Sequence, residues 1–420
     1  MRSEWKQCEW GDIATLEYGK SIRDYHTEAG RYRVYGTNGP IGWHDEPLCA
    51  HQGVIVGRKG AYRGIHYSPY PFFVIDTAFY LKTKEKMDLR WAYYCLLTYD
   101  INGMDSGSAI PSTSREAFYR LPVCVPPLKE QKAIACILGA LDDKIELNRR
   151  MNRTLEAMAR AIFKSWFIDF DPVRIKAEGK RMKADKKSAK NSIHLSSYTL
   201  PPSILDLFPD SFENSELGEI PKEWRVRPLP EVMHINPTRS LSKETLAPYL
   251  DMANMPTQGP SPESWIMREA GSGMRFINGD TLIARITPCL ENGKTAFVDF
   301  LAKGEVGWGS TEYIVLRSKD AIPPLFAYLL ARTEEFRTFA IQQMTGSSGR
   351  QRVPADSLEK YNIVTPDIDS PLFHHFGNLM STMFDRINAA MMQSRTLAAL
   401  RDALLPKLIS GEIRVKNLRS

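Results

Sequence analysis

One stretch of the chain, residues 128–170, limits the possible folds more than any other. It contains no proline and a single glycine, Gly139. Its apolar residues recur at the seven-residue spacing of a helix that packs lengthwise along a partner helix. We expect one unbroken helix of about 40 residues, roughly 60 Å long. The positions that would face the partner are Ile134, Leu141, Asn148, Leu155 and Ile162, flanked by Ile137, Leu138, Ile145, Met158 and Trp166.

A second stretch with the same pattern lies near the C-terminus, at a shift of 242 positions. Seven residues are identical at this shift, including the pair Asp143 and Asp385 and the pair Leu155 and Leu397. Two unrelated amphipathic helices would share the period but not so many identities, so we infer an internal duplication in which the two helices pair. The apolar positions of the second stretch are Phe376, Leu379, Met380, Met383, Ile387, Leu397, Leu400, Leu404 and Leu408.

The segments that precede the two helices also match one another. Residues 1–126 show short runs of β-branched and aromatic residues between Gly, Pro and Asn, which is typical of strands and turns, with one helix expected over residues 89–97. The same texture restarts at Gly218, at shifts that rise from 219 to 239 along the segment. The second copy is therefore longer, with insertions in its loops. The matched segments are Trp5 with Trp224, 53–58 with 280–285, 77–80 with 311–314, and 106–108 with 345–347.

These patterns predict an α+β fold with an internal pseudo-repeat: two globules of mixed α/β structure separated by two long antiparallel helices that form a coiled-coil-like spacer. A basic stretch follows the first helix, where residues 174–190 carry eight Lys or Arg against two acids. It is either a solvated linker or a tether that also contacts phosphates. The predicted segments are 1–126 (first globule), 127–171 (first long helix), 172–217 (basic and polar linker), 218–369 (second globule), 370–412 (second long helix) and 413–420 (C-terminal tail).

The charge balance and the cysteines restrict the class of function. The chain has 55 Lys and Arg against 49 Asp and Glu, a formal net charge of +6, which suits a polyanionic partner slightly better than a cationic one. Its six cysteines are scattered without C-x-x-C spacing, so we expect no disulfide framework, no zinc site and a cytoplasmic location. No apolar run approaches the ~18 residues that a membrane span requires.

Recognisable catalytic motifs are missing from the sequence. There is no G-x-x-x-x-G-K-[ST] phosphate loop, no strand-anchored G-x-G-x-x-G, and no H-E-x-x-H or G-x-S-x-G. The Asn/Asp-Pro-Pro-aromatic motif of amino-methyltransferases is also absent, since Thr238 follows Asn236-Pro237. A nuclease-like set could be assembled from Asp169 or Asp171 with Glu178-Gly179-Lys180, but it falls in the expected linker. We therefore expect a binding or scaffold component rather than an enzyme, with no catalytic residue, no metal ligand and no cofactor of its own.

Cationic and polar loops in the two globules are the best candidates for contact with DNA. Residues 57–64 combine cations, an aromatic residue and glycines that permit close backbone approach. Residues 105–115 and their copy at 345–354 are rich in Ser, Gly and Arg, whose guanidinium pairs with guanine edges. Polar turns with ordinary surface arginines are the alternative. The candidate DNA-binding residues are Arg58, Lys59, Tyr62, Arg63, Ser112, Arg115, Arg285, Thr287, Lys294, Arg350, Gln351 and Arg352.

Four longer motifs carry a resemblance to a known family. They are Pro126-Pro127-Leu128-Lys129-Glu130-Gln131, Trp166-Phe167-Ile168-Asp169-Phe170-Asp171-Pro172-Val173, Gly218-Glu219-Ile220-Pro221-Lys222-Glu223-Trp224 and Leu404-Leu405-Pro406-Lys407-Leu408-Ile409-Ser410-Gly411-Glu412-Ile413. With them, the chain resembles the specificity subunits of type I restriction–modification systems over essentially its whole length. It departs from the family at residues 366–371, where a second Pro-Pro and a Glu-Gln pair are usual, which puts the first turn of the second long helix in question.

The resemblance implies a function and a set of partners. Each globule would be a target-recognition domain that reads one half of a split site in double-stranded DNA. The chain would be non-catalytic and would recruit two methyltransferase subunits and then the restriction subunits, which would carry S-adenosylmethionine, ATP and Mg. Methyltransferase contact would fall on the long helices, at charged positions such as Arg149, Arg150, Arg153 and Arg395.

Geometry agrees with a spacer role for the helices. A rod of roughly 60 Å exceeds one DNA turn of about 34 Å, so globules at its ends could reach half-sites about one turn apart. Asn148 would either set the register of the helix pair or be exposed where the helices splay. Two other functions stay open: a stand-alone site-specific DNA-binding protein without restriction partners, and a fused methyltransferase or nuclease, against which the absent motifs argue.

Overall fold

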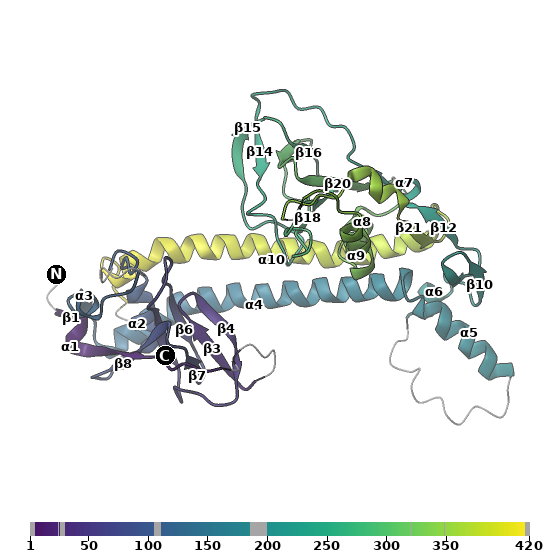
Figure 1. Ribbon diagram of the computed structural model, residues 1–420. Helices are drawn as coiled ribbons and strands as arrows, with labels where there is room; N and C mark the ends of the chain where they lie inside the picture. The colour runs from purple at the N-terminus through teal and green to yellow at the C-terminus, as the bar shows by residue number, and fades with distance from the viewer. Residues whose placement is uncertain are drawn as a thin grey trace. The chain divides into compact units, whose positions relative to one another are not determined.

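The computed structural model describes residues 5–23, 25, 30–104, 111–184, 200–319, 321–347 and 349–415. They fall into two compact units, which we describe separately: unit 1 comprises Met1–Leu147 and Met392–Ser420, and unit 2 comprises Asn148–Met391. Two long helices, α4 (Leu128–Phe167) and α10 (Pro371–Ile409), each contribute one half to each unit (Figure 1). The predicted class, two mixed α/β globules with two long helices, is confirmed.

Helix α4 ends earlier than the sequence pattern suggests. It stops at Phe167, and Phe170 adopts a left-handed backbone conformation with φ of 57°. The last turn is closed by amide groups of Ile168 and Asp169 that donate to the Lys164 carbonyl. The Asp169 carboxylate also accepts from Lys164 Nζ at 2.7 Å. The apolar spacing continues through this turn, and for that reason it did not mark the end of the helix.

A further helix, α5 (Asp171–Ala184), follows where we expected a linker to begin. Its first turn contains Pro172. Proline is favourable in a first turn because the amide groups there have no carbonyl partner within the helix, so no hydrogen bond is lost. Lys176 Nζ donates to the carbonyls of Leu205, at 3.2 Å, and Phe208. Part of the basic stretch is thus ordered against the chain of unit 2, while residues 185–199 lie outside the described residues.

The two long helices run antiparallel, as the order of two contacts in unit 2 shows. In unit 2, Asn148 Nδ2 donates to the Ala390 carbonyl at 3.2 Å and Asn152 Nδ2 donates to the Ile387 carbonyl at 3.3 Å. Asn148 is only 1% exposed, so it does not lie where the helices splay. Its partner is the residue that matches it at a shift of 242. In unit 1, Arg401 Nη1 donates to Asp142 at 2.7 Å.

Most of the predicted packing positions of the helix pair are at least partly covered, but Met158 and Leu400 are 48% and 47% exposed. Ile134, Asn148 and Ile387 are buried. Those of intermediate exposure are Leu141, Leu155, Ile162, Met383, Leu397 and Leu404. Ile134 packs in unit 1 with Leu138 and with Leu408 of α10, so it joins the globule to both helices rather than filling the seam alone.

In its described residues, unit 1 has three small sheets, and an aromatic core that includes Trp10, Trp91 and Phe118 packs against two of them. Strand order is β1-β9, β2-β8-β5-β6 and β4-β3-β7. The strands are β1 (Lys6–Glu9), β2 (Ala14–Tyr18), β3 (Tyr32–Gly36), β4 (Gly39–His44), β5 (Gly53–Gly57), β6 (Ile65–Ser68), β7 (Phe72–Val74), β8 (Ala78–Thr83) and β9 (Pro122–Val125). The short helices are α1 (Trp10–Ile13), α2 (Leu89–Leu96) and α3 (Arg115–Tyr119).

Helix α2 is the helix expected over residues 89–97. Asp88 caps it by accepting from the amides of Arg90 and Trp91. The helix covers strands β5 and β6 and buries Trp91 and Tyr94. It therefore lies between the four-stranded sheet and α4.

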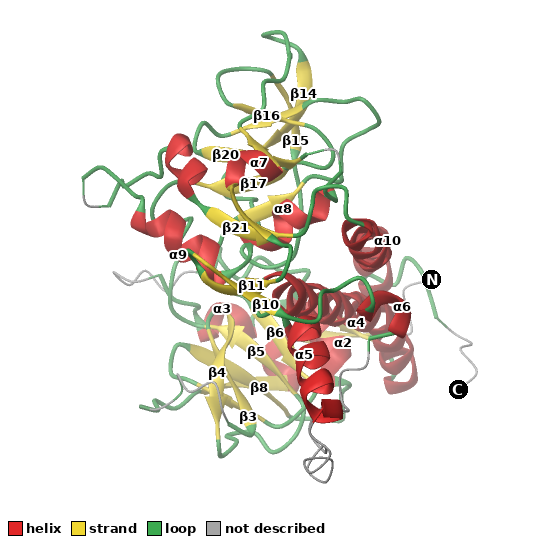
Figure 2. Ribbon diagram, turned by 90° about the vertical axis from the view of Figure 1, so that its right-hand side faces the viewer, coloured by secondary structure: helices red, strands yellow, loops and turns green. Residues whose placement is uncertain are grey.

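Unit 2 repeats this plan with longer loops (Figure 2). Strand order is β10-β11, β12-β21, β13-β20-β17-β18 and β15-β14-β19-β16. The strands are β10 (Phe212–Ser215), β11 (Gly218–Pro221), β12 (Arg225–Pro228), β13 (Met233–Ile235), β14 (Leu246–Leu250), β15 (Ile266–Glu269), β16 (Met274–Phe276), β17 (Thr281–Ala284), β18 (Thr295–Phe297), β19 (Gly307–Gly309), β20 (Tyr313–Ser318) and β21 (Asn362–Thr365). The helices are α6 (Pro202–Leu205), α7 (Leu229–Val232), α8 (Pro324–Ala331), α9 (Glu334–Gln342) and a 3-10 turn, η1 (Ala355–Lys360).

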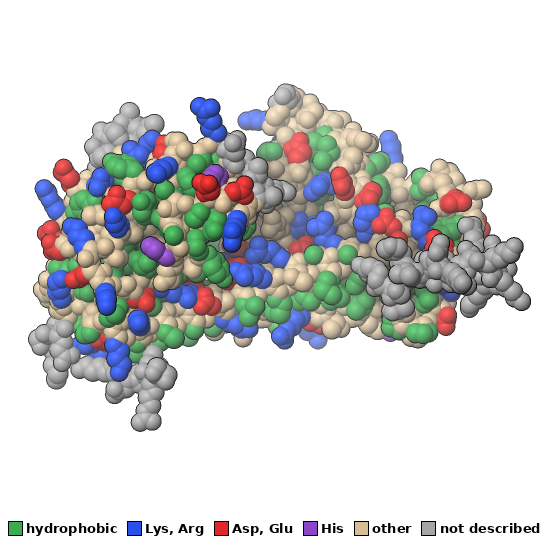
Figure 3. Space-filling model, turned by 90° about the horizontal axis from the view of Figure 1, so that it is seen from below, with side chains coloured by type: hydrophobic (Ala, Val, Ile, Leu, Met, Phe, Trp, Pro, Cys, Tyr) green, Lys and Arg blue, Asp and Glu red, His purple; other side chains and the backbone are tan. Residues whose placement is uncertain are grey.

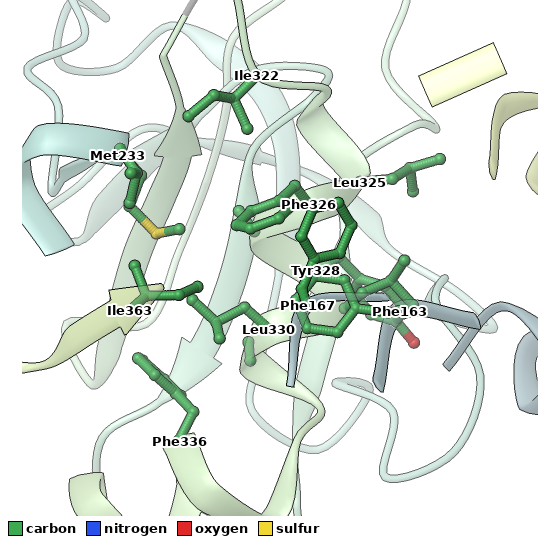
Figure 4. Close-up of a cluster of buried hydrophobic side chains, with 14 of the residues drawn as sticks. Phe163, Phe167, Met233, Ile322, Leu325, Phe326, Tyr328, Leu330, Phe336 and Ile363 are labelled. Atoms are coloured by element: carbon green, nitrogen blue, oxygen red, sulfur yellow. The ribbon is translucent and has the colours of Figure 1, made fainter. Parts of the chain in front are cut away.

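Helix α8 is the centre of the unit 2 core. Every residue from Leu325 to Ala331 is buried, since one side of the helix faces the β17–β20 sheet and the other faces the long helices. The ring of Phe326 lies 5.0 Å from that of Phe163 and 5.2 Å from that of Phe167, both on α4 (Figure 4). Edge-on aromatic contacts of this kind add to the burial of apolar area.

Strand registers demonstrate the duplication residue by residue. Three antiparallel residue pairs of unit 1 recur at equivalent positions of unit 2. They are Lys6–Val125 with Arg225–Thr365, Ala14–Thr83 with Met233–Ser318, and Gly57–Ala78 with Ala284–Tyr313. The first partners differ by the shifts of 219 and 227 that the sequence indicates. The match of residues 77–80 is corrected by one position, because Ala78 corresponds to Tyr313 at a shift of 235. Residues 106–108 lie outside the described residues.

Candidate nucleic-acid interface

Two loops meet at the same edge of the central sheet in each globule. The central sheet is β2-β8-β5-β6 in unit 1 and β13-β20-β17-β18 in unit 2. In unit 1 the first loop follows β5 (residues 58–63) and the second precedes α3 (residues 111–114, with 105–110 outside the described residues). The Thr113 amide donates to the Arg58 carbonyl at 2.9 Å, and Lys59 and Ser112 form an isolated β-bridge. Four candidates distant in sequence, Arg58, Lys59, Ser112 and Arg115, therefore belong to one loop pair.

The unit 2 loops are joined in the same way. The Val353 amide donates to the Arg285 carbonyl at 2.9 Å, and Ile286 forms a bridge with Arg352. The first loop is longer here: the amide of Ala284 closes it on the Lys294 carbonyl, whereas Gly57 closes the unit 1 loop on Gly64. The framework of the loop pair is thus conserved between the copies, and the side chains that it presents are different.

Two arginines of unit 1 share one aromatic ring. The Arg58 and Arg115 guanidinium carbons lie 4.7 and 5.2 Å from the centroid of the Tyr18 ring, which is 48% exposed. Arg58 Nη1 donates to the Asp76 carbonyl at 2.9 Å, and Arg115 donates to the Tyr119 hydroxyl. That hydrogen bond is the main reason that the pKa of Arg115 is raised. Two guanidiniums held on one ring form a concentrated positive charge that suits a phosphate.

The remaining unit 1 candidates differ sharply in exposure. Tyr62 is 80% exposed near the end of the first loop. Lys59 forms an exposed ion pair with Asp76 at 3.5 Å. Arg63, however, is 4% exposed, and its guanidinium donates to the carbonyls of Asn102 and Ile101 inside the globule. The prediction that Arg63 contacts DNA is therefore wrong, because its charge is used to hold two segments of the globule together.

In unit 2 an unpredicted carboxylate lies among the predicted cations. Glu312 accepts from Arg352 Nε at 2.9 Å and from Arg352 Nη2 at 2.7 Å. Arg285 Nε lies 4.0 Å from the same carboxylate. The hydrogen bond to Glu312 raises the pKa of Arg352. The Arg352 guanidinium is thus held in one orientation rather than free to rotate.

The other unit 2 candidates lie in the same loops. Arg350 is exposed and Gln351 is of intermediate exposure, with its carbonyl accepting from the Thr287 amide at 3.1 Å. Thr287 Oγ1 contacts Met344 Sδ at 3.5 Å. Lys294 is turned inward, since its Nζ donates to the carbonyls of Met252 and Ala253. These bonds give Lys294 a structural role at the base of the loop, and its contact with DNA stays a prediction.

Three residues of these sites escaped the sequence predictions: Tyr18, Asp76 and Glu312. Each lies on or beside a strand of the central sheet rather than in the Gly- and Arg-rich loops. Tyr18 ends β2, and Glu312 directly precedes β20. An aromatic or acidic residue close to a strand end would have been the only signal, and of the three only Tyr18 stands beside a glycine.

Charge is dispersed on the one face of unit 1 that Figure 3 shows. On this face, Lys and Arg side chains alternate with Asp and Glu instead of forming one basic patch. Among the residues that the structure describes, no cluster of His, Cys, Asp and Glu is suited to a metal ion. In the same part of the chain, no helix combines the length and apolar character needed to cross a membrane.

Comparison with known proteins gives a consistent result. A family model described as the type I restriction modification DNA specificity domain matches residues 2–157. The chain is 24% identical over 341 residues to the HindI specificity subunit of Haemophilus influenzae, covering 72% of this chain and 71% of that protein. It is 26% identical over 336 residues to the MjaIX specificity subunit of Methanocaldococcus jannaschii, covering 76% of this chain and 66% of that protein.

A solved structure shares the fold. The type I restriction–modification S subunit of M. genitalium superposes with a TM-score of 0.57 at 16% identity, covering 96% of each chain. That likeness shows that the two chains share a fold over nearly their whole length. Residues 2–157 thus match the type I restriction modification DNA specificity domain, and the chain is similar over about three quarters of its length to specificity subunits of type I restriction enzymes.

Proposed function

We propose that this chain is the DNA sequence-specificity subunit of a type I restriction–modification enzyme, in which each globule reads one half of a split site. The observation that carries the proposal is the pair of equivalent loops. Each unit holds them with an equivalent main-chain hydrogen bond, from Thr113 to Arg58 in unit 1 and from Val353 to Arg285 in unit 2. The bridge between the loops joins Lys59 to Ser112 in one unit and Ile286 to Arg352 in the other. A duplicated scaffold with exchanged loop side chains suits the recognition of two different sequences.

The loop side chains divide into two kinds of contact. Arg58 and Arg115, stacked on Tyr18, suit the phosphate backbone, which positions a protein without reading bases. Arg350, Gln351 and Arg352 carry the donor groups that distinguish guanine and adenine in the major groove. Tyr62, Lys59, Ser112, Arg285 and Thr287 complete the proposed contact set.

The long helices would separate the two readers. Asn148 and Asn152 donate to main-chain carbonyls of α10, and polar contacts within a helix pair fix its register. A fixed register would give the two half-sites a fixed spacing in the DNA.

The helices also offer surface for partner subunits. On α4, Leu147 is 57% exposed and Met158 is 48% exposed, and the charged residues Arg149 and Arg153 of the same helix are exposed as well. We expect two methyltransferase subunits, and restriction subunits in the full complex, to dock on the long helices. The expected contact positions also include Arg150 and Arg395. S-adenosylmethionine, ATP and Mg would belong to those partners. The chain itself would be non-catalytic and would act in the cytoplasm.

Methylation mapping tests the proposal. Cells that express the chain together with its methyltransferase subunit should gain methylated adenines within an asymmetric split motif. A continuous palindrome would refute the two-reader arrangement. Binding of a split site by a chain that associates with no methyltransferase subunit would favour a stand-alone DNA-binding protein. Methylation or cleavage of DNA by the purified chain alone would refute the non-catalytic role.

A further inference from the structure

We propose that Glu312 determines specificity in the unit 2 half-site by fixing the orientation of Arg352. This inference rests on the proposed function and adds a residue to it. The Arg352 side chain uses its Nε–Nη2 edge for the Glu312 carboxylate, with bonds of 2.9, 2.9 and 2.7 Å. Its other edge includes Nη1, which makes only a long bond of 3.4 Å to the Arg350 carbonyl. That edge is the one that can donate two parallel hydrogen bonds to a guanine.

The fold does not require a carboxylate at this position. Strand registers show that Glu312 of unit 2 is equivalent to Thr77 of unit 1, and that Arg352 is equivalent to Ser112. The main-chain contact is the same in both, since the Arg58 amide donates to the Thr77 carbonyl and the Arg285 amide to the Glu312 carbonyl. Unit 1 therefore builds the same sheet edge with a neutral residue. The Glu312–Arg352 pair is loop chemistry added to a common framework.

Stability gives no adequate reason for the pair either. The Arg352 side chain is 43% exposed and that of Glu312 is 23% exposed, and exposed ion pairs contribute little to folding because water screens them. Against DNA, an unpaired acid near phosphates is unfavourable. A carboxylate that holds an arginine in its fork geometry instead improves the discrimination between bases, because the arginine side chain loses less conformational freedom when it binds.

The charge of Glu312 also lowers the affinity of the site for DNA in general. Arg285 Nε and Arg352 Nη2 lie 4.0 and 2.7 Å from the same carboxylate, which offsets part of their combined charge. Sequence-independent binding depends on cations that neutralise phosphates. Glu312 would therefore weaken non-specific binding while it sharpens base recognition.

Selection from random duplexes tests the inference. The full chain with its methyltransferase subunit would be offered a random DNA library, and Glu312→Gln would be compared with wild type and with Asp367→Asn. Asp367 is an exposed acid of unit 2 paired with Arg227, away from the loops, so this control removes the same charge. Thermal unfolding would establish that the variants are folded.

We expect Glu312→Gln to lose discrimination of about 5- to 150-fold at one or two adjacent base pairs of one half-site. Arg352→Lys, which keeps the charge but not the fork, should relax the same base pairs. The other half-site should not change, and binding to random duplex should not weaken. Unchanged selection by a folded Glu312→Gln variant, or an equal effect of Asp367→Asn, would overturn the inference and leave the proposed function intact. Failure of the wild-type complex to select any sequence would refute the proposed function itself.

Discussion

Removing the Glu156 carboxylate should destabilise unit 2 more than any exposed ion pair could. Glu156, on α4, is 7% exposed and accepts from the Tyr328 hydroxyl at 2.6 Å and from the Gly259 amide at 3.0 Å. Arg332 is 9% exposed, and its Nε lies 3.7 Å from Glu156. This guanidinium also donates to carbonyls at Thr257, at 2.8 Å, and elsewhere. The network joins α4 to α8 and to the loop that contains Gly259.

The expected magnitude follows from burial. Removal of one partner of a buried ion pair costs about 3–5 kcal/mol. Because the carbonyl acceptors still satisfy most of the Arg332 donors, we expect Glu156→Ala to cost about 3 kcal/mol, at the lower end of this range. Unit 2 has 244 residues, and domains of that size lose about 2–4 °C in Tm per kcal/mol. The unit 2 transition should therefore fall by about 6–12 °C.

Calorimetry combined with hydrogen exchange would measure this effect in the full chain. Glu156→Gln should cost less, about 1–2 kcal/mol, since the amide retains an acceptor for one of the two donors. Asp142→Ala is the matched control in unit 1, where the Asp142 carboxylate accepts from Tyr94 at 2.6 Å and from Arg401 at 2.7 Å. It should reduce protection in unit 1 only. A Glu156→Ala variant with unchanged unit 2 protection and Tm would refute the assigned role of the network.

Three further predictions concern other parts of the chain. Glu130 should make the stability of unit 1 depend on pH. Burial raises the pKa of Glu130, but the hydrogen bonds from Arg414 and Trp5 outweigh this effect and lower the pKa. The stability that Glu130 contributes is therefore present above about pH 4.3 and is lost as the pH falls through the lower folded-state pKa; amide exchange against pH should show this loss, and Glu130→Gln should remove it. Arg63→Ala should lower unit 1 stability by about 2–4 kcal/mol, because buried carbonyls lose a charged donor, and denaturant unfolding should detect the loss, whereas the bases selected by unit 1 should not change. Deletion of one turn from both long helices, near Asn148 and its partner position, should shorten the DNA gap by about one to two base pairs, and methylation mapping should find both half-sites intact; altered half-sites would contradict the spacer role.

The framework could be predicted from the sequence because the duplication provides two copies of the same pattern, which can be compared. Periodicity located both long helices, and shifts of 219 and 227 agree with strand registers. The end of α4 was missed, since the apolar spacing continues past Phe167 into a turn that is set by the positive φ of Phe170. The register of β20 was missed by one residue, because aromatic and β-branched residues in a buried strand give little alternation to fix it.

The candidate site was less predictable than the fold. The sequence supplied the loops, but not which cations turn inward, and Arg63 and Lys294 are held by main-chain carbonyls of distant segments. Such contacts depend on tertiary geometry, which composition cannot show. The same holds for the acids: Asp76 and Glu312 come next to cations of the first loop only through the sheet.

The polar anchors of the two globules show how far the copies have diverged. At the shift of 242, Asp142 of unit 1 corresponds to Phe384 of unit 2, whose ring packs 5.6 Å from that of Tyr328. Conversely, Glu156 of unit 2 corresponds to Ala398. Each globule is therefore fixed to the helices by its own carboxylate, partly exposed in unit 1 and buried in unit 2, at positions where the other copy has an apolar side chain. A globule transferred to the other helix position would leave one buried carboxylate without its donors and one tyrosine without its acceptor, and buried unpaired groups of this kind cost several kcal/mol. The two globules share a framework but are not interchangeable, so under the proposed function the order of the two half-sites would be fixed by the chain.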